Sequence, residues 1–162
     1  MPRHAASKSA DPWTRVDVNR FFDSKQLTRV ERIVLRLALA AGFLSAVADR
    51  FGLWGKPGAS GVAWGDWSHF LTYTGKLNWF LPASLIPIVG AIATLGEAAL
   101  ALFLLVDAWP RYTALASGAL LLLFALAMTF TFGIKAPLDY SVYTAAAAAF
   151  YLSARAALPQ RS

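Results

Sequence analysis

The chain has 162 residues, of which 57% are hydrophobic and 15% charged, with a formal net charge of +6 and no cysteine. Ordinary soluble proteins are about 45–50% apolar and about 25% charged, and a small domain has too little interior to hide such an excess. The composition therefore argues against a soluble globular protein and against a disordered chain. The lack of cysteine excludes disulfides, thiolate metal sites and dithiol redox chemistry within the chain.

Residues 1–31 form a polar extension without a long apolar run. The extension is not a signal peptide, because no short apolar stretch is followed by a small-residue cleavage site. Within it, residues 13–31 are either a short helix on a membrane surface or a solvated tail. The character of the sequence changes at Arg32, where a second region, 32–158, begins. Residues 159–162 are a short tail.

Region 32–158 contains four apolar stretches long enough to cross a membrane as helices, at about 33–54, 82–108, 111–133 and 138–157. A hydrocarbon core of roughly 30 Å needs about 20 helical residues, and backbone groups in lipid must be satisfied within each segment. Pro137 and Asp139 are typical of a helix start, and they lie at the beginning of the fourth stretch. The sequence predicts an all-α, integral membrane four-helix bundle.

Residues 55–81 are too polar to span a membrane, but part of this segment has helical periodicity. One predicted face consists of Trp67, Phe70, Leu71, Thr74 and Leu77. We expect a helix lying at the lipid headgroups between the first and second spans. Its interfacial side chains would be Trp67, His69, Phe70 and Tyr73. A re-entrant segment that covers the bundle is the alternative.

The distribution of Lys and Arg predicts the orientation. With the N-terminus in the cytoplasm, the inner side holds 11 basic residues and the outer side 4. We therefore expect both termini in the cytoplasm, and we interpret the positive charge as a topogenic signal with some attraction to anionic lipid. A nucleic-acid footprint is not indicated.

Small residues predict where helices approach closely. They recur in the first span at Ala38, Gly42 and Ala46, in the third at Ala114 and Gly118, and in the fourth over residues 145–149. A compact bundle follows, and a homo-oligomer is compatible with the same pattern.

Ionisable residues inside a membrane are candidates for function. Glu97 lies deep within the second span, and Arg36 lies one turn into the first. Three interpretations of Glu97 stand side by side. It forms a structural pair with Arg36, it accepts protons or orients a ligand, or it is an unpaired acid held in its protonated form.

A second polar cluster is expected at the outer end, where the topology places residues from the first and fourth spans at similar depth. Its members are Asp49, Arg50, Lys135 and Asp139. They either form ion pairs across helices or line a polar mouth to which Tyr140, Ser141 and Tyr143 add hydroxyl groups. On the inner side, Asp107 and Arg111 are expected to form a local pair across the turn between the second and third spans.

Other chemistry is sparse. The chain has two histidines, His4 and His69, far apart in the sequence, and they predict no metal site. No phosphate-binding glycine loop, nucleophile elbow or metalloprotease motif occurs. The chain therefore has no autonomous catalytic motif, although helices of this kind can hold an organic cofactor.

Four segments resemble the DoxX family of small bacterial four-helix membrane proteins. They run from Arg36 through Phe51, from Trp67 to Thr74 with Asn78 and Pro82, from Thr94 to Glu97, and from Gly133 to Val142. The resemblance extends from about Arg32 to Arg155 and leaves out the polar extension. It implies a multi-pass protein of the bacterial inner membrane. Some members of the family are membrane subunits of a thiosulfate:quinone oxidoreductase, and others are linked to membrane-associated redox and oxidative-stress complexes.

Three functions follow from these observations. The first is a membrane subunit or anchor of a quinone-linked redox complex, in which a partner protein carries the metals or thiols that this chain lacks. The second is a small oligomeric transporter or proton-coupled permease, with a route from the outer cluster to Glu97 and Arg36. The third is a purely structural membrane protein whose charges lock the bundle.

Overall fold

The computed structural model describes residues 24–157, with side chains from Arg29 onward, and this part of the chain is helical without strands. The helices are α2 (Ser24–Arg50), α3 (Trp67–Leu77), η1 (Ala83–Leu85), α4 (Ile86–Val106), α5 (Pro110–Phe132), α6 (Lys135–Asp139) and α7 (Val142–Ala157). The all-α prediction is confirmed. Most of the predicted polar extension and the tail at 159–162 lie outside the described residues.

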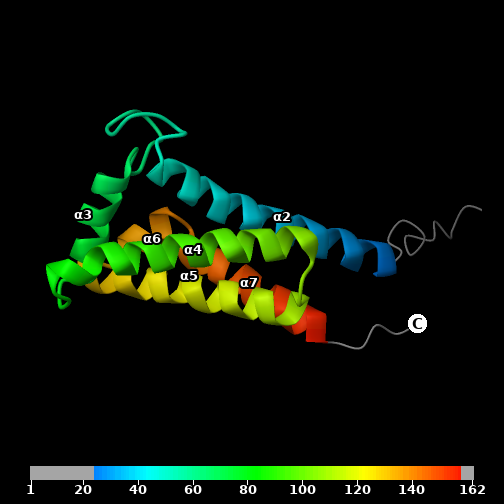
Figure 1. The fold of residues 1–162 in the computed structure, drawn as a ribbon. Coiled ribbons are helices and arrows are strands. Elements are labelled where there is room, and N and C mark those ends of the chain that lie inside the picture. The colour runs from blue at the N-terminus through cyan, green and yellow to red at the C-terminus, as the bar shows by residue number, and fades with distance from the viewer. Residues whose placement is uncertain (1–23, 158–162) are drawn as a thin grey trace, which may run out of the picture.

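Four helices run along the long axis of the molecule, and one crosses it (Figure 1). The long helices are α2, α4, α5 and α7; α5 packs most extensively against α7, and α2 against α4. Helix α3 lies across the end at which α2 finishes and α4 starts, and it contacts α4, α5 and α2. The predicted helix between the first and second spans is therefore present.

Helix α2 differs from the predicted first span, 33–54, at both ends. It is already helical before residue 33, and it ends at Arg50 instead of residue 54. The helix is present from Ser24, where the described residues begin, because helix-forming residues continue from the polar segment into the apolar one. It ends at Arg50 because Gly52 has a positive φ of 74°, and a Cβ there would lie 2.8 Å from the carbonyl oxygen of Gly65. A glycine is required at this close approach.

Helices α4 and α5 agree with the predicted second and third spans. Prolines lie in the first turn of each helix, where the missing N–H has no helical partner to lose. The turn between the helices is tight, with Asp107 and Trp109 both at positive φ.

The predicted fourth span is not one continuous helix. Helix α6 contains Pro137 and ends at Asp139, and α7 begins at Val142. The break occurs at Ser141, whose φ of 55° lies in the left-handed region, where a helix cannot continue. The sequence did not predict this break, because Pro137 and Asp139 are typical of the start of one continuous helix.

Small residues account for the close packing of α5 on α7. A Cβ on Gly118 would lie 2.8 Å from the ring of Phe150, and Ala114 and Ala149 are fully buried. On α2 the same pattern has no partner within the described residues, since Ala38 and Gly42 are exposed and nothing lies within 4 Å of a Cβ on Gly42. The expectation of close packing therefore holds for the third and fourth stretches and not for the first.

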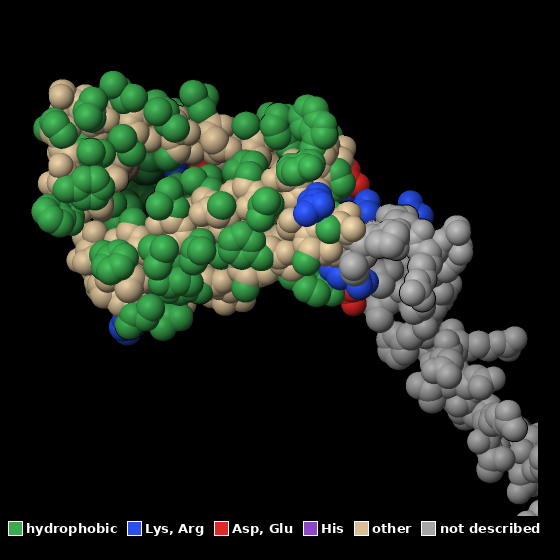
Figure 2. All heavy atoms as spheres, turned by 90° about the horizontal axis from the view of Figure 1, so that it is seen from below, with side chains coloured by type: hydrophobic (Ala, Val, Ile, Leu, Met, Phe, Trp, Pro, Cys, Tyr) green, Lys and Arg blue, Asp and Glu red, His purple; other side chains and the backbone are tan. Residues whose placement is uncertain are grey.

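Two of the described helical segments are long and apolar enough to cross a membrane, Ala83–Val106 and Pro110–Phe132. Of the 18 residues in the most apolar part of each segment, only 28% and 22%, respectively, are buried inside the protein. Large apolar side chains instead face outward, among them Leu95 at 70% and Phe130 at 84% exposure. Hydrophobic side chains cover much of the face shown in Figure 2, which is also hollowed near the end that carries α3.

Candidate functional site

The site is built where the end of α2 meets α3 and the middle of α4. Helix α3 is positioned by its N-cap, Asp66, whose carboxylate accepts a hydrogen bond from the backbone N–H of His69 at 2.8 Å. The same carboxylate contacts the His69 ring at 2.9 Å. The backbone hydrogen bond from His69 is the main reason why the pKa of Asp66 lies below its usual value of 3.8. His69 is itself exposed and serves the start of the helix.

A buried ion pair forms the centre of the site. Arg50 Nη2 lies 2.6 Å from Glu97 Oε2, and both side chains are only 3% exposed. Arg50 Nη1 donates a hydrogen bond to Thr94 Oγ1 at 2.7 Å, and Thr94 Oγ1 donates in turn to the carbonyl of Gly90 at 2.8 Å. Thr94 precedes Glu97 by three residues, so both side chains face α2 from the same side of α4.

Aromatic rings of α3 and the preceding loop cover the Arg50 guanidinium. Its central carbon lies 4.1 Å from the centre of the Phe70 ring and 5.3 Å from that of Trp64. A desolvated guanidinium over aromatic faces is stabilised by the ring quadrupoles. The Nε of Arg50 is buried without a hydrogen-bond partner among the described atoms, so one donor of this group is unused.

The neighbouring Asp49 holds the loop between α2 and α3. Its carboxylate accepts hydrogen bonds from the backbone N–H groups of Ala63, Trp64 and Gly65 at 2.9, 3.0 and 3.3 Å. The tip of the loop is open, since nothing lies within 4 Å of a Cβ on Gly58 or Gly61. Asp49 therefore fixes the last part of the loop, residues 63–65, and this places Trp64 against Arg50.

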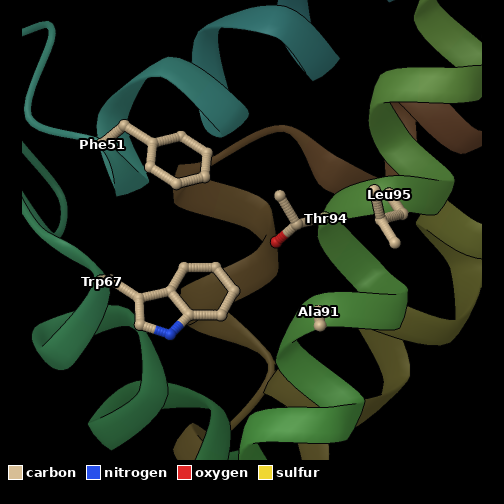
Figure 3. A pocket seen from close by; sticks show the side chains of 5 residues that line it. All are labelled: Phe51, Trp67, Ala91, Thr94 and Leu95. Carbon is tan, nitrogen blue, oxygen red and sulfur yellow. The ribbon is translucent and has the colours of Figure 1, made fainter.

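An apolar pocket of about 380 Å³ adjoins the ion pair (Figure 3). Its lining residues are Phe51, Trp67, Ala91, Thr94 and Leu95. The rings of Phe51 and Trp67 are nearly parallel, with centres 5.9 Å apart, and they face α4 across the pocket. Because Phe51 and Leu95 are exposed, the pocket opens on the outside of the helix bundle.

Three tyrosines lie in or near this end of the molecule: Tyr73 in α3, Tyr140 after α6 and Tyr143 in α7. Tyr73 stacks on Phe132 with ring centres 5.5 Å apart, and burial raises its pKa to about 12, so its phenol stays neutral. Tyr143 shares a hydrogen bond with Thr129 at 2.8 Å. Tyr140 is exposed beyond the end of α6.

The predicted pairing of Glu97 with Arg36 is wrong. Arg36 lies near the opposite end of the molecule, where it donates to the carbonyls of Leu104 and Leu105 at 2.7 and 3.0 Å and pairs with Asp107 at 2.9 Å. Leu104 is two helical turns beyond Glu97, out of reach of one side chain. Glu97 pairs with Arg50 because α3 and its loop cover the end of α2 and bury that arginine.

Two further pairings also differ from the prediction. The four residues of the outer cluster do not pair with one another across helices. Lys135 pairs with Asp139 within α6, Arg50 pairs with Glu97 of α4, and Asp49 binds backbone N–H groups of the loop. The expected pair between Asp107 and Arg111 is absent from the described ion pairs; Asp107 binds Arg32 at 2.8 Å in addition to Arg36.

The pocket contains residues that the sequence did not mark as site residues. Phe51, Ala91 and Leu95 carry no chemical signal in a hydrophobic sequence. Thr94 could have been found, because it lies one turn from Glu97 on the same face. Of the predicted interfacial residues, Trp67 lines the pocket and Phe70 is buried beneath Arg50.

The arrangement can bind a flat apolar molecule in an apolar pocket beside a buried ion pair whose two charges offset each other. Among the residues whose side chains are described, no three His, Asp or Glu lie close enough together to hold a metal ion. No protein-family model, no curated protein and no solved structure matches this chain.

Proposed function

We propose that this chain is an integral membrane protein that binds a quinone and serves as the membrane subunit or anchor of a redox complex. The observation that carries this proposal is the outward-facing pocket beside the buried Arg50–Glu97 pair. A membrane position is supported by the exposed apolar side chains of α4 and α5, which would form a very large hydrophobic patch in water. The 21 residues of α4 are about 31 Å long, close to the thickness of a hydrocarbon core.

The remaining helices complete the proposed bundle. Helix α2 has 27 residues and is long enough to cross; Arg29, Arg32 and Arg36 lie in its first half, and Arg50, at its end, is in the buried pair. Helices α6 and α7, of 5 and 16 residues, would together cross the hydrocarbon core, which neither helix is long enough to cross alone. In this arrangement α3 lies at the outer headgroups and both termini are cytoplasmic, as the distribution of basic residues predicts. The DoxX-like segments support the same topology and a bacterial inner membrane.

The pocket is suited to the ring of a quinone. Its volume of about 380 Å³ lies within the range of roughly 300–1,000 Å³ typical of small-molecule sites. Its wall is apolar except at Thr94, and it opens toward the proposed lipid phase, from which a quinone with an isoprenoid tail would enter. Phe51 and Trp67 provide ring surfaces for stacking.

The ion pair behind the pocket would set the electrostatics of the bound ring. Arg50 donates a hydrogen bond to Thr94 on the pocket wall. Because the charges of Arg50 and Glu97 offset each other, the pair would present a dipole and not a net positive charge to a bound ring. Glu97 holds the guanidinium in place, which makes it a positioning residue. The electrons would come from a partner protein, because the chain has no cysteine and supplies no redox centre of its own.

The proposal is tested by measuring quinone binding with the full chain purified in mild detergent. Ala91→Phe fills the pocket, and we expect it to weaken the binding of a short-tailed ubiquinone or menaquinone analogue about tenfold or more. Ala116→Phe, the same change at an exposed position of α5, is the matched control and should bind normally. Absence of binding by the unaltered protein, or equal loss in both variants, would overturn the proposal.

Transport is a second candidate, favoured by the buried Arg50–Glu97 pair alone. A charged pair within a proposed membrane segment is typical of ion and proton pathways. Its test is proton or solute flux in proteoliposomes, which Glu97→Gln would abolish if the pair lies on the route. Normal quinone binding with no flux in the unaltered protein excludes this candidate.

A further inference from the structure

One end of the molecule has an excess of positive charge. This arginine end consists of the start of α2, the turn between α4 and α5, and the last turns of α7. Its arginines are Arg29, Arg32, Arg36, Arg111 and Arg155, and its acids are Glu31 and Asp107. Five positive charges against two negative ones leave a surplus of three. Figure 2 shows several basic side chains gathered at this end.

Two of the arginines already have partners. Arg32 and Arg36 share Asp107, and Arg36 also binds the last carbonyls of α4. Arg111 and Arg155, in contrast, make no side-chain hydrogen bond or ion pair with any residue between 29 and 157. The centre of the Tyr112 ring lies 6.0 Å from the Arg111 guanidinium carbon.

The elements that carry Arg111 and Arg155 are held together. Ser153 Oγ in α7 donates a hydrogen bond to the backbone carbonyl of Arg111 at 3.0 Å, so the last turns of α7 lie against the start of α5. Exposed aromatic residues lie within two positions of Arg111 or Ser153 in the sequence: Trp109 and Tyr112 are each 68% exposed, and Tyr151 is 50% exposed. Tyrosine and tryptophan at such positions are typical of the depth of lipid headgroups.

We propose that Arg111 and Arg155 bind the phosphate headgroup of an anionic phospholipid in the cytoplasmic leaflet. The proposal rests on the membrane placement given above and is independent of the quinone site. Guanidinium groups match phosphate oxygens in geometry and charge, and anionic lipids attract basic residues near a membrane surface. The aromatic side chains would contact the glycerol backbone and upper acyl chains, which free phosphate lacks.

The opposite end lacks this property. This loop end, formed by the end of α2, the following loop, α3, α6 and the part of α4 that pairs with Arg50, is electrically balanced among the described residues. Its basic residues are Arg50, Lys56, Lys76 and Lys135, and its acids are Asp49, Asp66, Glu97 and Asp139. Charge complementarity therefore places an anionic lipid at the arginine end and not at the loop end.

The test is native mass spectrometry of the full chain in detergent with equal amounts of phosphatidylglycerol and phosphatidylcholine. We expect the unaltered protein to retain phosphatidylglycerol preferentially. The variant Arg111→Gln with Arg155→Gln should bind this lipid about 30-fold more weakly, if each guanidinium contributes as basic residues near anionic membranes do. Lys56→Gln with Lys76→Gln, at the loop end, is the matched control and should retain the lipid.

Three results would overturn this proposal: equal retention of the two lipids, unchanged retention in the double arginine variant, or full displacement of the lipid by inorganic phosphate. The last result would show a site for phosphate alone. Quinone binding, measured in the same preparation, should be normal in the double arginine variant. Loss of lipid preference with normal quinone binding thus separates failure of this inference from failure of the proposed function.

Discussion

The loop end and the arginine end handle their charges in opposite ways. At the loop end, Arg50 and Glu97 are buried against each other, and Asp49 is buried against backbone N–H groups. At the arginine end, Arg32 and Asp107 remain partly exposed, and the positive charges outnumber the acids. Burial therefore fixes the geometry of the charged groups at the loop end, whereas charged groups stay accessible to solvent at the arginine end.

The largest expected effect comes from breaking the buried pair. Arg50→Gln leaves Glu97 buried without a partner, and we expect a loss of about 3–5 kcal/mol in the free energy of unfolding. Thermal or SDS unfolding of the detergent-solubilised protein measures this loss. Combining Arg50→Gln with Glu97→Gln should cost less than the sum of the single changes, because neither partner is then left charged and alone. Additive losses would show that the pair is not coupled.

The next effect concerns the loop clamp. Asp49→Asn removes a buried carboxylate that accepts three backbone hydrogen bonds, and we expect a loss of about 1.5–3 kcal/mol. Limited proteolysis should show faster cleavage near Lys56. Asp139→Asn, the same change in an exposed pair within α6, is expected to cost less than about 1 kcal/mol. Similar effects of the two changes would remove the distinction between buried and exposed charge.

A smaller effect is expected at the arginine end. Arg36→Gln removes the donors to the carbonyls of Leu104 and Leu105, but Arg32 continues to neutralise Asp107. The expected loss is about 1 kcal/mol, because the region is partly exposed and water can replace the lost donors. Thermal unfolding of this variant beside Arg50→Gln compares the two ends directly. An equal loss would show that burial does not separate them.

The smallest effect depends on pH and concerns the start of α3. Because folding lowers the pKa of Asp66 through the hydrogen bond from His69, the stabilisation is complete above the usual value of 3.8 and is lost as the pH falls below it. Tryptophan fluorescence, dominated in this region by Trp64 and Trp67, should report the change. Asp66→Asn can still cap the helix and should abolish this acid transition. A transition that persists in this variant must arise from another group.

The helices were predictable from the sequence to different degrees. Helices α4 and α5 have strong apolar runs bounded by proline and turn residues, and α3 has a clear helical face, so their positions agree with the prediction. The division between α6 and α7 depends on the backbone conformation of Ser141, which the residue type does not encode. The helical residues 24–31 fall within the stretch predicted to be either a short surface helix or a solvated tail. Their continuity with the first span was not predicted, because hydropathy marks apolar segments and not the helical turns before them.

The site was predictable in its residues and not in its pairings. Glu97, Arg50 and Asp49 stood out as charges in or beside apolar stretches. Which arginine meets Glu97 depends on how α3 and the loop fold over the end of α2, and that is a long-range property. The pocket could not be foreseen, because Phe51, Ala91 and Leu95 differ from other apolar residues only in their position.

The open tip of the loop after α2 offers a practical means of mapping topology. Asp49 fixes the loop at residues 63–65, whereas Gly58 and Gly61 are exposed and contact nothing. A short epitope inserted between these glycines would therefore leave the anchored half of the loop undisturbed. Such a tag, probed by antibody in intact and in permeabilised cells, would report on which side of a membrane this loop lies without altering any charge of the chain.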